Sequence, residues 1–197
     1  MANMKLAALS SCLWVLGMGF MATTAHAEQA DRNAPLTVEA DAMQYNDKAK
    51  TTTFTGRVVG SKGSMQLRAS HVVIQQFASG NYRTTVTGDS KQQAYMRQKR
   101  EGMNEFIEGQ ANSIVRDDHS QSMQLSGNAR MRRLAGSTPM DEIIADTIVY
   151  NEATETYSAR GGASTAGSAA RGGVPAGRVR VTLTPSTKTT SSTSKRP

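Results

Sequence analysis

The sequence predicts an all-β protein made of many short antiparallel strands, and two observations lead to that fold class. Segments rich in Thr, Val, Ile, Tyr and Phe recur between residues 35 and 160, and no long stretch there has the apolar spacing of an amphipathic helix. Dipeptides that favour turns separate these segments. The expected strands include 51–59, 65–75, 82–87, 123–125 and 143–150, with turns at Asn46-Asp47, Gly80-Asn81, Asp117-Asp118 and Asn151-Glu152.

An internal repeat organises these strands. Three units begin with an alanine and carry a glycine sixteen residues later, and a looser unit runs from Ala69 to Gly88. The fourth position is apolar in all four units (Met43, Val72, Ile114 and Ile148). The regular pairs are Ala40 and Gly56, Ala111 and Gly127, and Ala145 and Gly161.

Each unit has the order strand, turn, strand, glycine, strand, which predicts a stack of hairpins. A single hairpin cannot bury its apolar face, whereas stacked hairpins form two facing sheets around a shared apolar interior. The glycines are expected at bulges or sharp bends where a strand turns a corner. The alternative is a chance pattern in a protein rich in threonine and glycine.

Residues 1–27 have the features of a secretory signal peptide. An apolar run extends from Leu6 to Met21, and Ala25-His26-Ala27 has the small residues that signal peptidase requires, so cleavage is expected after residue 27. A competing interpretation is a lipoprotein signal that would lipidate Cys12, but the apolar stretch before Cys12 is too short. Cleavage after residue 27 removes the only cysteine and the only tryptophan, which excludes a disulfide or a thiolate nucleophile in the mature chain.

The C-terminal region carries the excess positive charge. The formal net charge is +7, yet residues 28–159 hold 15 basic and 16 acidic side chains, and no acidic residue follows Glu155. The basic region lacks aromatic side chains that could stack on bases, so no nucleic-acid partner is expected. The expected organisation is a β domain at 28–160, a Gly/Ala-rich linker or loop at 161–176, an edge strand at 177–185 and a disordered basic tail at 186–197.

We find no catalytic constellation, and we therefore expect no enzyme activity, no metal and no cofactor. The sequence Asp117-Asp118-His119-Ser120 could suggest a triad or a metal site. Adjacency in a turn does not provide the geometry of a triad, and no further ligand cluster supports a metal ion. His71 is expected at the surface of a strand, and Asp141-Glu142 in a solvated loop.

Four segments that follow the signal peptide have the order and spacing of a known family's motifs. They are Pro35–Asp41 (PLTVEAD), Phe54–Val58 (FTGRV), Leu125–Ala129 (LSGNA) and Ala145–Tyr150 (ADTIVY). Together they resemble the LptA/OstA family of periplasmic lipopolysaccharide-transport proteins. The resemblance covers residues 35–160, and 177–185 is similar to the family's closing strand. The Gly/Ala-rich insert and the basic tail depart from the family's compact pattern.

The resemblance implies an open, twisted β-jellyroll, or β-taco, whose two facing sheets hold the acyl chains of lipopolysaccharide. It implies a periplasmic carrier that passes lipopolysaccharide from the inner to the outer membrane. The partners it implies are other copies of the chain, an inner-membrane anchored LptC-like domain and the N-terminal domain of an outer-membrane LptD-like translocon. Unpaired edges at Leu36–Ala40 and Arg178–Leu183 would join these partners by strand pairing.

A lipid site of this kind is a continuous apolar groove, because each buried methylene contributes about 0.8 kcal/mol without directional contacts. Every candidate could equally be an ordinary core residue. Two basic clusters could meet head-group phosphates or be solvated faces. They are Arg130, Arg132 and Arg133 after a strand, and Arg97, Lys99 and Arg100 in an expected loop. The candidate lipid-binding residues are Leu36, Val38, Phe54, Val58, Leu67, Val72, Tyr95, Ile107, Ile114, Leu125 and Ile148.

Three other classes of protein fit parts of the pattern. A secreted structural or adhesive β-sandwich would share the strands and edges but would have a closed, dry interior. A secreted sugar-binding or hydrolytic enzyme would need aromatic platforms and paired carboxylates. A membrane-anchored relative of the same fold would keep its N-terminal apolar segment.

Overall fold

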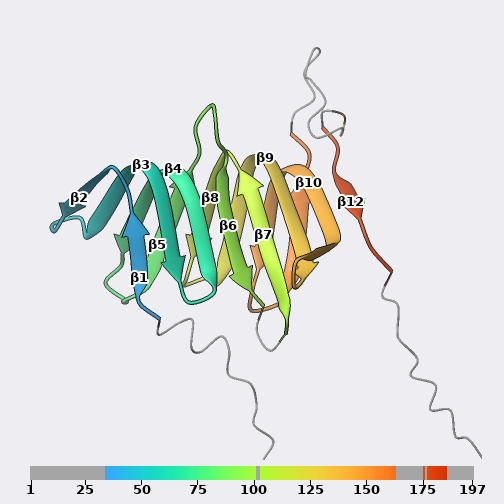
Figure 1. The fold of residues 1–197 in the computed structure, drawn as a ribbon, viewed down its shortest axis with the longest axis horizontal. Helices are drawn as coiled ribbons and strands as arrows, with labels where there is room; N and C mark the ends of the chain where they lie inside the picture. Colours follow the sequence, from blue (N-terminus) through green and yellow to red (C-terminus); the bar gives the residue numbers. More distant parts are fainter. Residues whose placement is uncertain (1–33, 101–102, 163–174, 176, 186–197) are drawn as a thin grey trace, which may run out of the picture.

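The computed structural model describes residues 34–100, 103–162, 175 and 177–185. The expected signal peptide at 1–27, most of the segment 161–176 and the expected tail at 186–197 therefore lie outside the described residues. The described part is built of strands and turns, as the sequence predicts, and contains no helix long and apolar enough to cross a membrane (Figure 1).

Twelve strands follow one another along the described chain. They are β1 (Leu36–Glu39), β2 (Ala42–Asn46), β3 (Thr51–Lys62), β4 (Met65–Gln76), β5 (Tyr82–Thr87), β6 (Ala94–Lys99), β7 (Glu105–Ala111), β8 (Ser113–Asp117), β9 (Ser122–Ala135), β10 (Thr138–Asn151), β11 (Thr156–Arg160) and β12 (Arg180–Thr182).

All twelve strands belong to one antiparallel sheet that folds back on itself. In β4, the first half pairs with β6 through Gln66–Arg68, and the second half pairs with β5 through His71–Gln76. The sheet therefore has two layers, and each of the long strands β3, β4, β9 and β10 contributes one of its halves to each layer. The first layer adds β1, β6, β7 and β12 to these strands, and the second layer adds β2, β5, β8 and β11.

The long strands bend along one line, which we call the spine, and the strand ends on the opposite side form the mouth. Figure 1 shows the strands side by side, from β1 and β2 at one end to β10 and β12 at the other. This arrangement is the expected open jellyroll of two facing sheets.

Two bulges bend β3 and β9 at the spine. Gly56 and Arg57 together face one residue of β4, and Gly127 and Asn128 face one residue of β10. Both glycines have a positive φ, +79° at Gly56 and +76° at Gly127, which strongly favours glycine. The prediction that these glycines mark corners is confirmed.

The second residue of the repeat explains the spacing of sixteen. The backbone N–H of Asp41 donates to the carbonyl of Gly56 (3.0 Å), and that of Asn112 donates to the carbonyl of Gly127 (2.8 Å). The Asn112 side chain lies over the glycine, because a Cβ at residue 127 would come within 2.7 Å of the Asn112 amide nitrogen. Each corner thus needs glycine for its backbone conformation and for this close approach.

The third corner brings together two glycines that are distant in sequence. Gly161 follows β11 in the second layer and lies against the backbone of Gly177, which precedes β12 in the first layer. The Asp146 side chain packs over the next glycine, Gly162.

The core lies between the layers, with small side chains facing large ones. Leu125 packs directly on the backbone of Gly109 from the opposite layer, since a Cβ there would lie 2.9 Å from a Leu125 methyl group. The two layers are therefore in contact in the middle of the interior. The alanines of the first layer are Ala69, Ala94, Ala111, Ala129 and Ala145, and the fully buried side chains of the second layer are Val72, Val86, Ile114, Leu125 and Ile148.

Candidate functional site

A cavity of about 510 Å³ opens at the mouth, between β1, β3 and β4 of the first layer and β4, β5 and β8 of the second. This volume falls within the usual range of ligand cavities. Its apolar wall comes from both layers: Leu36, Met65 and Leu67 face Ile74 and Tyr82. The local sequence places them there because alternate residues of a strand share one face.

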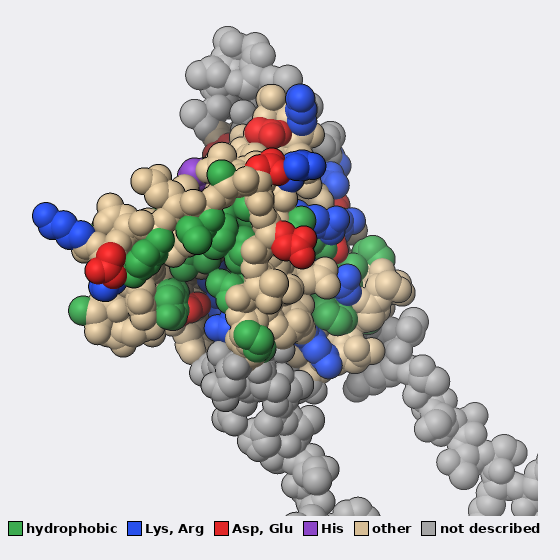
Figure 2. Space-filling view, turned by 60° about the vertical axis from the view of Figure 1, so that its left-hand side comes forward, with side chains coloured by type: hydrophobic (Ala, Val, Ile, Leu, Met, Phe, Trp, Pro, Cys, Tyr) green, Lys and Arg blue, Asp and Glu red, His purple; other side chains and the backbone are tan. Residues whose placement is uncertain are grey.

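The apolar wall reaches the molecular surface at the end of the stack that holds β1 and β2. Figure 2 looks toward this end and shows hydrophobic side chains gathered at its centre, with charged side chains around them. Leu36 and Tyr82 keep about two fifths of their surfaces exposed, at 43% and 41%. Large exposed apolar side chains beside a cavity are the arrangement that an apolar ligand would cover.

The cavity wall also includes a lysine. Lys62 faces the interior from the end of β3, because it pairs with Leu36 and Met65 in register. An ammonium group at the rim of an apolar cavity suits an amphiphile with an anionic head.

The predicted lipid-binding residues fall into two groups. Leu36 and Leu67 line the mouth cavity, and Ile107 lines a second cavity of about 280 Å³ beside it. Val38 and Phe54 are partly buried against the core. The others in the interior, Val58, Val72, Ile114, Leu125 and Ile148, are packed and at most 1% exposed. Whether any of them contacts lipid stays a prediction.

Tyr95 does not belong with this set, because it lies on the outer face of the first layer. Its neighbour Met96 faces the interior and pairs with Leu67, so Tyr95 points outward. The Tyr95 hydroxyl donates to Glu108 at 2.7 Å, and the Arg68 guanidinium lies 4.5 Å from its ring centre. Burial and the bond to Glu108 raise the pKa of Tyr95. The candidate groove therefore excludes Tyr95.

Sequence reasoning missed several residues of the cavity wall. Met65, Ile74 and Tyr82 are apolar residues near strand ends, and the alternation from Leu67 to Met65 and from Val72 to Ile74 would have found two of them. Arg116 had no such signal, because a charged residue on a strand predicts a solvent-facing position.

Arg116 crosses the mouth from the second layer to the first. Its Nη1 donates to the Gln98 side-chain oxygen at 2.9 Å, its Nε lies 3.2 Å from Asp118, and both its Nη groups bind the Glu152 carboxylate. Burial acts to lower the pKa of Arg116, but Glu152 and then Asp118 outweigh it, so the pKa is raised. The guanidinium thus stays charged inside the mouth.

The two predicted basic clusters are largely paired with carboxylates. Arg97 and Lys99 lie in strand β6 rather than in the expected loop. Asp141 and Glu142 likewise lie in β10, not in a solvated loop. The ion pairs are Arg100 with Glu105 and Glu155, Arg130 with Glu142, Arg132 with Glu108, and Arg133 with Asp141 and Glu105. This pairing leaves Arg100 and the cluster at 130–133 less able to hold phosphates than the sequence suggested, whereas Arg97 donates to the Gly136 carbonyl and lies over the Phe106 ring.

The segment around His119 is a polar turn. The Asp117 carboxylate accepts hydrogen bonds from the backbone N–H groups of His119 (2.9 Å) and Ser120 (3.1 Å), and from Arg83. These bonds lower the pKa of Asp117, with the Arg83 bond contributing most. The His119 side chain is exposed and has no triad geometry. Among the described residues, no group of three His, Cys, Asp or Glu side chains could hold a metal ion.

Comparison with known families identifies the family of this chain. A family model described as LptA/(LptD N-terminal domain) LPS transport protein matches residues 37–156, more than half of the chain. The chain belongs to this family. The matched residues run from β1 to the first residue of β11, so they include the spine, most of both layers and the mouth cavity except Ala34 and Leu36, while β12 lies beyond them.

Characterised relatives carry the family's name. The chain is 22% identical over 137 residues to the lipopolysaccharide export system protein LptA of Escherichia coli K12, covering 70% of this chain and 72% of that protein. LptA of Shigella flexneri gives the same figures.

The fold matches a solved structure as well. The crystal structure of LptH from Pseudomonas aeruginosa aligns with a TM-score of 0.63 and 23% sequence identity, over 79% of this chain and 99% of that one. LptH is described as the LptA homologous periplasmic component of the conserved lipopolysaccharide transport device. At this identity the likeness establishes the fold.

Proposed function

We propose that this protein is a periplasmic carrier that binds lipopolysaccharide and passes it from the inner toward the outer membrane. The observation that carries the proposal is the apolar cavity at the mouth, in a member of a lipopolysaccharide-transport family. The acyl chains enter between the layers beside Leu36, Met65 and Leu67. Each buried methylene contributes about 0.8 kcal/mol, so several long chains supply a large driving force.

Transfer by this chain requires binding and release, with no bond made or broken. The side chains that most resemble a catalytic group, Asp117 and His119, form the polar turn described above. We therefore propose that the protein is not an enzyme, and that the energy for directional transport comes from its partners.

The partners we propose join at the ends of the stack. Among the described residues, β1 and β2 form the edges at one end, and β11 and β12 form those at the other. Edge strands offer unpaired backbone groups that another sheet can extend. A second copy, an LptC-like domain at the inner membrane and the LptD-like N-terminal domain at the outer membrane are the partners that fit this mode.

A structural or adhesive β-sandwich is the alternative. The packed centre around Leu125 suits such a module, but it does not account for an open cavity lined by Leu36 and Tyr82. The carrier is therefore the function that the geometry supports better.

Changing Leu36 tests the proposal. Leu36→Asp places a carboxylate in the cavity wall, and Val59→Asp is the matched control, because Val59 is 49% exposed and faces outward from the adjacent strand. Loss of one buried leucine contact costs about 1.5–3 kcal/mol, so Leu36→Asp should weaken lipopolysaccharide binding about tenfold or more. Equal affinity of both variants, or binding of deacylated lipopolysaccharide as tight as that of the intact lipid, would contradict it.

A further inference from the structure

Arg116 lies where the interior of the mouth changes from apolar to polar. Across the second layer, register places Arg116 level with Thr84 of β5 on one side and Met123 of β9 on the other. The next strands outward contribute Ile74 and Tyr150 at the same level. A single cation thus interrupts a row of interior-facing and mostly apolar side chains.

The contacts of Arg116 tie the two layers together. Gln98 belongs to β6 of the first layer, whereas Asp118 and Glu152 follow β8 and β10 of the second. The Arg116 and Glu152 side chains are only 18% and 15% exposed. Because the pair is largely removed from water, each charge depends on the other and on Gln98.

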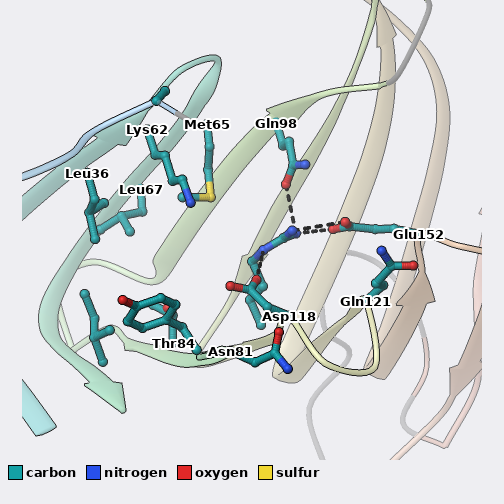
Figure 3. Close-up of a pocket in the computed structure, with 14 residues that line it drawn as sticks. Leu36, Lys62, Met65, Leu67, Asn81, Thr84, Gln98, Asp118, Gln121 and Glu152 are labelled. Carbon is teal, nitrogen blue, oxygen red and sulfur yellow. Dashed lines mark hydrogen bonds and ion pairs between the residues drawn. The ribbon is translucent and has the colours of Figure 1, made fainter. Parts of the chain in front are cut away.

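This network separates the two cavities of the mouth. The larger cavity has Leu36, Met65 and Tyr82 in its wall, and the smaller one has Ile107 and Tyr150. Gln98, Gln121 and Glu152 border both. Figure 3 shows Leu36, Met65 and Leu67 on one side of Gln98 and Asp118, with Glu152 and Gln121 on the other.

An acyl chain has no group that could replace these bonds. If it passed the network, the guanidinium and the Glu152 carboxylate would face hydrocarbon without partners, which is strongly unfavourable. A chain that enters from the β1 side therefore meets apolar contacts as far as Arg116 and a barrier beyond it.

We propose that Arg116 is a positioning residue that confines the acyl chains to the cavity between β1 and β8. An acyl chain in the first cavity reaches the second, beside Tyr150, only when Arg116 releases Gln98 and the layers part. This inference rests on the proposed lipid-binding function. It assigns the two cavities different roles. The first is the resting site of the ligand, and the second fills when the bond between Arg116 and Gln98, which we call the tie, breaks.

Two tyrosines allow a direct test, because Tyr82 lines the first cavity and Tyr150 the second. A photoreactive phenylalanine analogue is placed at each site, and adducts with purified lipopolysaccharide are counted. We expect adducts mainly at residue 82. Gln98→Ala removes the acceptor in the first layer but leaves the Arg116–Glu152 pair. Since one hydrogen bond to a charged group shifts an equilibrium about tenfold, the ratio of adducts at 150 to those at 82 should rise about tenfold.

Arg83→Gln is the matched control, because Arg83 also pairs with an aspartate next to the same turn, Asp117, but on the outer face. This variant should leave the ratio unchanged. Arg116→Met is the stronger variant, but it strands the Glu152 carboxylate and risks unfolding, so Gln98→Ala carries the test. Equal adducts at both tyrosines in the unmodified protein, or no change in Gln98→Ala, would overturn the proposal.

A measurement without lipid separates this inference from the proposed function. Spin labels at the exposed residues Gln66 and Gln124, on the outer faces of the first and second layers, report the distance between the layers. The mature chain expected after cleavage at residue 27 contains no other cysteine. Gln98→Ala should broaden the distance distribution, and an unchanged distribution would overturn the role of the tie. Absence of adducts at Tyr82 in every variant would instead refute lipid binding.

Discussion

Asn112 and Gly127 show how single residues fix the corner of this fold. The glycine provides a backbone conformation that other residues adopt at a cost, and the absent side chain leaves room for the Asn112 amide. Asp41 and Gly56 repeat the arrangement one corner away. The geometry of the spine therefore depends on a few pairs rather than on the composition of the strands.

Gly127→Ala should destabilise the protein more than Gly80→Ala does. Both glycines have a positive φ, +76° and +83°, so both substitutions bear the strain of a left-handed backbone, about 1–2 kcal/mol. Nothing lies within 4 Å of a Cβ at residue 80, whereas a Cβ at residue 127 would meet Asn112. Urea unfolding of the two variants measures the difference, and equal free energies of unfolding would contradict the role of the close approach.

At this scale the sequence predicts the corners better than the faces. The spacing from Ala111 to Gly127 locates a glycine corner without any structure. The facing of Tyr95 is not predicted, because a shift of one residue in a strand exchanges its two faces, and a tyrosine suits either one. The position of Arg116 inside the mouth is also not predicted, since its partners Gln98 and Glu152 are distant from it in the sequence.

At the scale of strands, β9 illustrates why the elements are longer than the sequence indicates. Residues 123–125 are a predicted strand, and Gly127 is expected at a bulge or sharp bend. The structure continues β9 from Ser122 to Ala135, because the bulge bends the strand into the other layer without breaking it. A bulge and a turn use the same residue types, and only the pairing partners distinguish them.

Strand β11 is held to β10 by a pair of stacked tyrosines. The rings of Tyr150 and Tyr157 lie 4.6 Å apart between centres, at 20° to each other. Burial raises the pKa of both hydroxyls above the ordinary tyrosine value. The neutral forms are thus favoured in the folded state.

The raised pKa values predict a loss of stability in alkali. The stabilisation is fully present below the unfolded tyrosine pKa of about 10 and is lost as the pH rises toward the folded pKa values. The free energy of unfolding should therefore fall above pH about 10, and the Tyr150→Phe, Tyr157→Phe double variant should flatten this fall. Denaturant unfolding at several pH values checks it, and an identical pH dependence in the double variant would refute the assignment.

At the scale of the whole molecule, the interior is divided unevenly along the stack. The centre is packed around Leu125 and Gly109, the mouth near β1 is open and apolar, and polar ties cross it farther along, at Arg116–Gln98 and Arg100–Glu155. Sequence periodicity predicts which residues face inward. It does not predict which of them touch the opposite layer, because that depends on how closely the two layers approach.

The open ends predict self-association by strand pairing. Val181 is 52% exposed and lies in β12. Among the described residues, β12 pairs only with β10. Val181→Pro removes a backbone donor from this edge and should lower the oligomer fraction, while Val181→Thr, which keeps the donor, should not. Sedimentation velocity over a range of concentrations measures the fraction. Oligomers that persist unchanged in Val181→Pro would show that this edge is not the interface.

The most direct test of the carrier is photocrosslinking in living cells, with the crosslinker at Leu36, at Met65 and at Lys48 as the exposed control. Leu36 and Met65 line the mouth cavity, and Lys48 lies in the turn between β2 and β3, away from it. We predict lipopolysaccharide adducts at residues 36 and 65 and none at residue 48. A folded, exported protein that gives no adduct at either cavity position, or equal adducts at all three, would contradict the account.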